Sequence, residues 1–266
     1  MTRKSKGPEA KDVPVTEAQG ARLARDKEIW KRLEDVIAEN GHSFQHVLSL
    51  FPAYVRRLHM GRFLAHYELF KNVIDLPGHI VELGVYRGPS FFTWAKLLEI
   101  FCPGDRKRLV YGFDNFAGFQ GFAPEDGKTD PAFGKVMGGY SPGSVRPEIE
   151  ELVAVNTMDN MIPDIARAKL VVGNIDETLP RFCEENPGLR ISLLHFDIDL
   201  YEPTKLGLEL LYPLVVKGGV VIFDEYGMVP WAGETNAVDE YFDKLGDRPV
   251  IRKFPTTTQP HGYFIK

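Results

Sequence analysis

The stretch from Ser192 to Gly227 constrains the fold more than any other part of the sequence, because it has the pattern of a strand, a helix and a second strand. Ser192–Phe196 is a short, mostly apolar run and Val220–Phe223 is a continuous one, as is typical of strands buried on both faces. Between them, leucines recur at helical spacing after Pro203, and Gly218–Gly219 is expected to end the helix. Strands joined in this way lie parallel in one sheet. The sequence therefore predicts an α/β fold.

Both of these strands end in acidic residues. Asp197 and Asp199 follow the first strand, and Asp224 and Glu225 follow the second. Parallel neighbours lie about 4.8 Å apart, and open α/β sheets bind ligands at the carboxyl edge of the strands. Carboxylates crowded there repel one another unless a hard cation lies among them or one takes up a proton. The pattern favours a Mg²⁺ site, and the alternative is that these acids cap helices or lie in solvated loops.

Composition narrows the class of protein. A chain of 266 residues with 44% hydrophobic residues can form one large α/β domain, with or without an N-terminal extension. The net charge of −5 argues against a nucleic-acid surface, and no apolar run approaches the ~18 residues of a membrane span. The basic, polar start lacks the apolar core of a signal peptide. We expect a soluble, cytoplasmic protein that binds neither nucleic acid nor membrane, with Cys102 and Cys183 as buried or half-buried thiols.

The N-terminal part is expected to contain no strand. Residues 1–18 are polar and basic, so we expect a disordered tail. Ala21–Glu39 and Arg57–Ile74 have helical periodicity and form a helical extension over residues 19–76. These helices could cover the edge of the sheet, wall the substrate site or form the surface of a homo-oligomer. The histidines of this region are expected to be surface or packing residues: His42, His46, His59 and His66.

A glycine turn follows the first expected strand, His79–Leu83. Gly84 and Gly88 flank the turn and Pro89 opens a helix, so a ligand can approach the backbone and the helix N-terminus. The turn lacks the full G-x-G-x-x-G spacing, which argues against NAD or FAD. The next strand, Leu109–Phe113, ends in Asp114, which is placed either to accept hydrogen bonds from a ribose or to cap a turn.

The remaining segments complete the predicted domain, residues 77–266. Residues 118–146 are rich in Gly and Pro and are expected to form a lid loop, the alternative being a disordered insertion. A hairpin-like pair, Pro249–Phe254 and His261–Ile265, predicts a strand inserted antiparallel. Helices and a strand are expected between these segments: Pro147–Val155, Lys169–Val172, Ile175–Glu184 and Glu234–Leu245.

Five motifs carry a resemblance to a known family: IVELGVYRGPS (Ile80–Ser90), YGFDNFAGF (Tyr111–Phe119), NIDETLP (Asn174–Pro180), FDIDLYEPT (Phe196–Thr204) and GGVVIFDEYG (Gly218–Gly227). With them the sequence resembles class I S-adenosylmethionine-dependent methyltransferases. More narrowly, it resembles the macrocin and mycinamicin O-methyltransferase family, whose members methylate sugar hydroxyls on antibiotics. The resemblance implies a Rossmann-like, mostly parallel sheet with one antiparallel strand near the C-terminus, and S-adenosylmethionine and Mg²⁺ as cofactors.

The resemblance also implies roles for single residues. The implied metal ligands are Asp197, Asp224 and Glu225. The family usually has Asp at the position of Glu225, so the longer side chain of Glu225 must reach the ion in this chain. Asp197 is the expected catalytic base, with His195 and Asp199 as alternates. The expected cofactor-binding residues lie in and after the first two strands: Glu82, Gly84, Tyr86, Arg87, Gly88, Ser90, Asp114 and Asn115.

These residues suit methyl transfer to a hydroxyl oxygen. An alcohol is a poor nucleophile near neutral pH, so the site must stabilise the developing alkoxide with a cation and offer a base for the proton. We therefore expect a metal-dependent O-methyltransferase that acts on a sugar or a glycosylated natural product. The alternatives are an enzyme for catechols or phenols, and a non-catalytic cofactor-binding partner of a biosynthetic enzyme.

Overall fold

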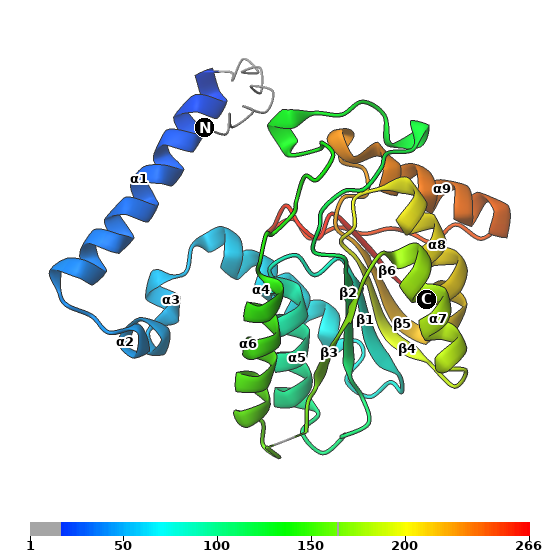
Figure 1. The fold of residues 1–266 in the computed structure, drawn as a ribbon, viewed down its shortest axis with the longest axis horizontal. Coiled ribbons are helices and arrows are strands. Elements are labelled where there is room, and N and C mark those ends of the chain that lie inside the picture. The colour runs from blue at the N-terminus through cyan, green and yellow to red at the C-terminus, as the bar shows by residue number, and fades with distance from the viewer. Residues whose placement is uncertain (1–16, 164) are drawn as a thin grey trace, which may run out of the picture. The chain divides into compact units, whose positions relative to one another are not determined.

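A computed structural model describes residues 17–163 and 165–266 of the chain. These residues form a six-stranded sheet with the strand order β3-β2-β1-β4-β5-β6 (Figure 1). The strands β1 to β5 run parallel, and β6 pairs antiparallel with β5. This confirms the expected mostly parallel sheet with an antiparallel strand near the C-terminus. The bounds are β1 (His79–Leu83), β2 (Val110–Asp114), β3 (Ala168–Val172), β4 (Ile191–Phe196), β5 (Val215–Phe223) and β6 (Gly262–Ile265).

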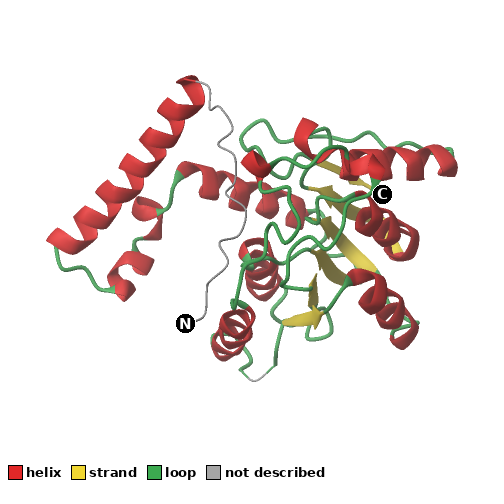
Figure 2. Cartoon of the chain, turned by 45° about the horizontal axis from the view of Figure 1, so that its top comes forward, coloured by secondary structure: helices red, strands yellow, loops and turns green. Residues whose placement is uncertain are grey.

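Helices cover both faces of the sheet (Figure 2). One face packs against α4 (Arg57–Lys71), α5 (Pro89–Phe101) and α6 (Arg146–Met158), and the other against α7 (Ile175–Glu185), α8 (Tyr201–Leu211) and α9 (Ala232–Leu245). Successive strand residues enter opposite cores, so that Leu193 lies in the first and Leu194 in the second. This explains why the sequences of the central strands are mostly apolar and do not alternate between polar and apolar residues.

The expected end of the helix at Gly218–Gly219 is wrong. The helix α8 ends at Leu211, because Pro213 follows in a 3₁₀ turn and cannot supply a backbone N–H to continue it. The strand β5 begins at Val215 and runs through both glycines. The pairing of β4 with β5 shifts register in this region, and a Cβ on Gly219 would lie 2.7 Å from Cγ1 of Val215. The glycines therefore accommodate an irregularity in the strand.

The expected C-terminal hairpin is only half present. The strand β6 pairs with β5 and lies at the edge of the sheet, so it is not inserted between parallel strands. The residues expected to pair with it form a single isolated bridge, between Arg252 and Tyr263. The other expected helices and strands of this region are present, with their ends shifted by no more than about one helical turn.

The chain divides into two compact units, residues 1–60 and 61–266. The first contains α1 (Glu17–Glu39), α2 (Phe44–Ser49), α3 (Phe51–Tyr54) and the start of α4. The expected tail lies outside the described residues apart from Glu17 and Ala18, which begin α1. From Gly61 onward α4 belongs with the sheet, since its Leu69 and Phe70 enter the first core. No described helix combines the length and the apolar character that a membrane crossing needs.

Hydrogen bonds fasten the Gly- and Pro-rich segment of residues 118–146 to the helices after β4 and β5. The carboxylate of Asp126 is buried and accepts from the backbone N–H of Tyr201 at 2.8 Å, at the start of α8. The buried ammonium of Lys135 donates to the backbone oxygens of Asp126 and Pro230. These contacts hold the middle of the segment beside the carboxyl edge of the sheet.

Candidate active site

Asp197 and Asp224 come together because their strands are neighbours in register. Phe196 of β4 pairs with Phe223 of β5, so the next residue of each strand leaves the sheet at the same place. One oxygen of each carboxylate accepts a hydrogen bond from the same guanidinium nitrogen of Arg62, at 2.8 Å for Asp197 and 2.5 Å for Asp224. The Asp224 side chain is fully buried, and 26% of the Asp197 side chain is exposed. The two carboxylates thus share one cationic group.

His195 is fully buried behind these acids. Its Nε2 lies 3.0 Å from Oδ1 of Asp224, and its Nδ1 lies 3.6 Å from Oε2 of Glu82. Burial acts to lower the pKa of His195, but its interactions with Asp224 and Glu82 prevail and raise it to about 10. The Nε1–H of Trp94 donates to Nδ1 at 3.4 Å, so both ring nitrogens of this fully buried histidine are engaged within the protein. This geometry argues against His195 as the base.

Glu225 and Asp199 lie in a more crowded acidic environment. Oε1 of Glu225 accepts from Gln259 at 2.7 Å, and its buried Oε2 has no hydrogen-bond partner among the residues described. Burial and the charge of Asp199 raise the pKa of Glu225 well above its usual range. Burial and the charge of Asp197 raise the pKa of Asp199 to about 8. Burial and mutual repulsion thus favour the protonated form of both carboxyl groups.

The side chains at this site provide some of the ligands that a hard divalent cation requires. Ligand atoms of His195, Asp197 and Asp224 lie within 4.8 Å of one another, and Glu225 is not in this group. Oxygens of Asp197 and Asp224 already converge on one positive nitrogen, which is the arrangement a cation requires. His195 is engaged with Asp224, whereas Glu225 has a buried oxygen without a partner. Asp197 and Asp224 could hold Mg²⁺, and Glu225 has an oxygen to offer it.

Asp114 ties the end of β2 to the turn that follows β1. Its Oδ2 accepts from the backbone N–H groups of Val85 at 2.9 Å and Tyr86 at 2.7 Å, and its Oδ1 accepts from Phe116 at 2.7 Å. A carboxylate has about four acceptor positions, so roughly one remains for a ligand. Of the two roles that the sequence left open for Asp114, the turn-forming one is present in the structure.

The glycines of the turn are needed for contacts within the protein. A Cβ on Gly84 would lie 1.8 Å from the backbone oxygen of Asp197, so only glycine lets the loop after β4 pass. Gly88 has a φ of 83° at the start of α5, and a Cβ there would lie 2.8 Å from the ring of Phe92. The sequence interpretation attributed both glycines to the approach of a ligand, which the structure does not test.

The other expected cofactor residues fall into two groups. Glu82 and Ser90 are buried and hydrogen-bonded to each other at 2.8 Å, beside His195. Tyr86 and Arg87 are exposed, and Asn115 is half-buried and donates to Oδ1 of Asn174 at 3.1 Å. The exposed group lies where a ligand can reach it, and the buried pair supports the turn from inside.

Sequence reasoning missed Arg62 and Gln259. The guanidinium of Arg62 also donates to Oε1 of Gln259 at 3.2 Å, and Gln259 donates to Glu225. Arg62 lies one helical turn before His66, on the face of α4 that also carries Leu69. A charged residue in line with the buried face of a helix was the available signal. Gln259 lies in an irregular loop, where the sequence has no helical or strand periodicity that could mark a residue as buried.

Aromatic side chains stand beside the carboxylates. The ring of Tyr140 lies 5.9 Å from Tyr86, 5.6 Å from Phe119 and 5.9 Å from Trp231, measured between centroids. Burial and the charges of Asp199, Glu225 and Asp197 raise the pKa of Tyr140 to about 12. Tyr86 and Tyr140 remain 40% and 48% exposed. These four residues, called the aromatic wall below, join the β1 turn to the Gly- and Pro-rich segment.

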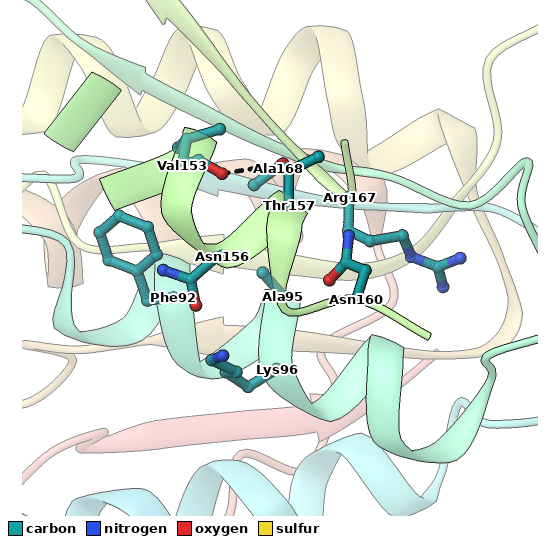
Figure 3. Close-up of a pocket in the computed structure, with 9 residues that line it drawn as sticks. All are labelled: Phe92, Ala95, Lys96, Val153, Asn156, Thr157, Asn160, Arg167 and Ala168. Carbon is teal, nitrogen blue, oxygen red and sulfur yellow. Dashed lines mark hydrogen bonds between the residues drawn. The ribbon is translucent and has the colours of Figure 1, made fainter. Parts of the chain in front are cut away.

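A small hollow lies away from this site, between α5, α6 and the start of β3 (Figure 3). Phe92, Thr157 and Arg167 are among its lining residues, and its free space of about 10 Å³ suits roughly one water molecule. None of the residues expected to bind cofactor or metal lines it.

A family model described as Macrocin-O-methyltransferase (TylF) matches residues 62–248. The chain belongs to the macrocin O-methyltransferase family. The match begins at Arg62 and includes the β1 turn, the Gly- and Pro-rich segment and all the carboxylates of the site.

Two relatives of this chain are named as O-methyltransferases. Demethyldecarbamoylnovobiocin O-methyltransferase of Streptomyces niveus is 34% identical over 171 residues, 64% of this chain and 60% of the relative. A second relative, from Streptomyces olivaceus, is 31% identical over 183 residues, 68% of this chain and 64% of its own. Its name is 8-demethyl-8-(2,3-dimethoxy-alpha-L-rhamnosyl)-tetracenomycin-C 4'-O-methyltransferase. The matched part of the chain thus spans less than two thirds of the length of either relative.

Solved structures extend the similarity to nearly the whole chain. The crystal structure of CalS11, described as calicheamicin methyltransferase, has a TM-score of 0.81 at 28% identity and covers 98% of this chain and 99% of that one. An apo structure of CalS11, described as a TDP-rhamnose 3'-O-methyltransferase, has a TM-score of 0.74 at 28% identity and covers 91% and 94%. The sheet described above is therefore the class I methyltransferase fold that the sequence predicted.

Proposed function

We propose that this protein transfers a methyl group from S-adenosylmethionine to a hydroxyl of a sugar or glycosylated natural product, with the help of a divalent cation. The observation that carries the proposal is the convergence of one oxygen each from Asp197 and Asp224 on a single positive nitrogen at the carboxyl edge of the sheet. Ligands of open α/β sheets bind at this edge. Family membership supports the type of reaction.

The cofactor would lie on the exposed side of the β1 turn. There the side chains of Tyr86 and Arg87 are accessible, Asp114 keeps an acceptor position, and the N-terminus of α5 faces the ligand edge. The sulfonium of S-adenosylmethionine supplies an electrophilic methyl group when it is bound. The protein's part is to hold that methyl group in line with the acceptor oxygen.

The two aspartates suit different tasks. Burial and the charge of Asp224 raise the pKa of Asp197 to about 7, against the opposing charges of Arg62 and His195. A base with a pKa near the working pH is well placed to take the hydroxyl proton. Burial also acts to raise the pKa of Asp224, but Arg62 and His195 prevail and lower it to about 2. Asp197 is proposed as the base because 26% of its side chain is exposed and an acceptor can reach it, whereas the fully buried Asp224 is proposed as a permanent anion. Glu225 is proposed as a third metal ligand.

The aromatic wall supports a sugar acceptor. The partly exposed ring of Tyr140 offers a flat apolar surface beside the carboxylates, which suits the C–H face of a sugar ring. CalS11, with the same fold over nearly the whole chain, is described as acting on TDP-rhamnose. We infer that the acceptor is a deoxysugar or a glycoside bearing one.

Turnover measured with a panel of acceptors tests the proposal. Purified protein, S-adenosylmethionine and Mg²⁺ would be offered TDP-deoxysugars, glycosides and catechols. We expect methylation of a sugar hydroxyl, loss of turnover in EDTA and recovery on adding Mg²⁺. Turnover of catechols alone, or of no acceptor despite cofactor binding, would contradict the assignment.

Variants of the carboxylates test the metal site within the same assay. Asp197→Asn and Asp224→Asn should each lower kcat at least about 100-fold while cofactor affinity is unchanged. Glu225→Gln should raise the Mg²⁺ requirement, and Glu225→Asp should retain activity because it restores the family's usual pair. Full activity of the Asn variants, or of the protein in EDTA, would show that these acids are not a metal site.

A further inference from the structure

We propose that Arg62 is a built-in cation which occupies the metal position of the metal-free protein, and that a divalent cation must displace its guanidinium in order to bind. The inference rests on the metal site of the proposed function. It assigns to Arg62 the role of setting how tightly that site holds its ion.

The distances do not allow both cations at once. One nitrogen of Arg62 lies 2.8 Å from Oδ2 of Asp197 and 2.5 Å from Oδ2 of Asp224. Mg²⁺ requires its oxygen ligands at about 2.0–2.1 Å. An ion that used these same two oxygens would lie between them, where the guanidinium nitrogen now is. Two positive charges at such a distance would also repel each other strongly.

The position of Arg62 can be vacated by movement of its side chain alone. About a quarter of that side chain, 24%, is exposed, so a path toward solvent exists. Its buried Nε has no hydrogen-bond partner within the described part of the chain, so its hydrogen bonding there is incomplete. His66, one turn later, packs 4.5 Å from the ring of Trp94 and 5.7 Å from that of His195. Packing thus fixes the helix α4, so the guanidinium of Arg62 can leave by rotation of its own side chain once its hydrogen bonds to Asp197, Asp224 and Gln259 break.

Displacement of Arg62 would also change the surroundings of the third carboxylate. Arg62 donates to Oε1 of Gln259, and Gln259 donates to Oε1 of Glu225. Once the guanidinium leaves, the side-chain amide of Gln259 is held at one end only and can move together with Glu225. The chain of hydrogen bonds therefore connects all three proposed ligands to one residue. Arg62 would act as a competitor for the ion, separately from the chemistry of methyl transfer.

Binding of Mn²⁺, measured by calorimetry at fixed pH and without cofactor or acceptor, tests the inference. Arg62→Gln removes the competing charge and should bind Mn²⁺ about 10- to 100-fold more tightly than the unaltered protein, since each charge-assisted hydrogen bond opposes displacement. Arg62→Lys keeps the charge and should lie between the two. The matched control is Arg146→Gln, which removes an exposed ion pair with Glu150 and should leave Mn²⁺ affinity unchanged. Equal or weaker binding by Arg62→Gln would overturn the inference.

A second measurement uses the unaltered protein, because loss of Arg62 leaves the buried Asp224 without its cation and could prevent folding. The Nε–H signal of Arg62 in a ¹⁵N spectrum, identified by its absence from Arg62→Lys, should shift as Mg²⁺ is added. An unmoved signal under conditions where Mg²⁺ binding is complete, or the absence of any bound Mg²⁺, would overturn the inference. Turnover enters neither readout, so failure here is distinct from failure of methyl transfer.

Discussion

Asp114 shows how one carboxylate can shape a turn and still face a ligand. Three backbone N–H groups, from Val85, Tyr86 and Phe116, point at its two oxygens. They hold Tyr86 and Phe116 at positive φ, 53° and 56°, which residues other than glycine seldom adopt. The same carboxylate lies at the ligand edge, at the end of β2. Its removal therefore affects the shape of the turn as well as any contact with a ribose.

Asp114→Ala should weaken binding of S-adenosylhomocysteine by about 1.5–3 kcal/mol, the range of a lost charge-assisted hydrogen bond. Calorimetry would measure this. The matched control is Asp105→Ala, since Asp105 also accepts from two backbone N–H groups but precedes β2 and so lies at the opposite edge of the sheet. An unchanged affinity in Asp114→Ala would remove Asp114 from the cofactor site.

At the scale of elements, the Gly- and Pro-rich segment of residues 118–146 is the part that the sequence predicts to be a lid. Its middle is held by Asp126 and Lys135, while Lys128 between them is exposed. Backbone hydrogen bonds between Phe119 and residues Gly138 and Gly139 close its base. If the segment opens, its buried polar contacts must break, including those of Lys135.

Lys135→Met should speed trypsin cleavage after Lys128, because the carbonyl groups of Asp126 and Pro230 lose their buried donor. Mass spectrometry of timed digests would show this, with exposed Lys107→Met as the control. If the segment is a lid, S-adenosylhomocysteine and acceptor together should slow the same cleavage in the unaltered protein. Cleavage rates that do not depend on ligands would show that the segment does not close over them.

At the scale of the whole molecule, buried charge links stability to pH. The folded chain holds the His195 proton up to a pKa of about 10, whereas an unfolded histidine loses it near 6.5. The folded state therefore binds more protons between these values, and the stabilisation is complete below pH 6.5 and is lost as the pH rises toward 10. His66 is the opposite case, since burial and the charge of Arg62 lower its pKa well below 6.5.

The free energy of unfolding, measured with urea in EDTA between pH 7 and 9, should fall more steeply for the unaltered protein than for His195→Asn. The difference in slope should reach about 1.4 kcal/mol per pH unit, the value for one proton. His66→Asn is the matched control, because above pH 7 that imidazole is neutral in both states. Parallel slopes for His195→Asn and the unaltered protein would show that His195 is not held as a cation.

The sequence by itself determined the sheet and the place of its acids. Short, mostly apolar runs such as Ile80–Leu83 and Ser192–Phe196 are long enough only for strands, and burial on both faces requires helices on both sides. Because Asp197 and Asp224 directly follow neighbouring parallel strands, their approach was predictable from chain order alone. The sequence was misleading at Gly218–Gly219, where the expected end of a helix is an irregularity inside β5.

Only the tertiary structure decided what surrounds those acids. Arg62 is 135 residues from Asp197 and 162 from Asp224, and Gln259 is 197 residues from Arg62. Periodicity shows which face of a helix is buried, but it does not show which buried faces meet once the chain closes. The same holds for His195, whose sequence context is that of any strand residue and whose charge depends on Glu82 and Asp224 from two other strands. A local pattern records the environment of a residue along its own element, whereas electrostatic partners are set by packing between elements.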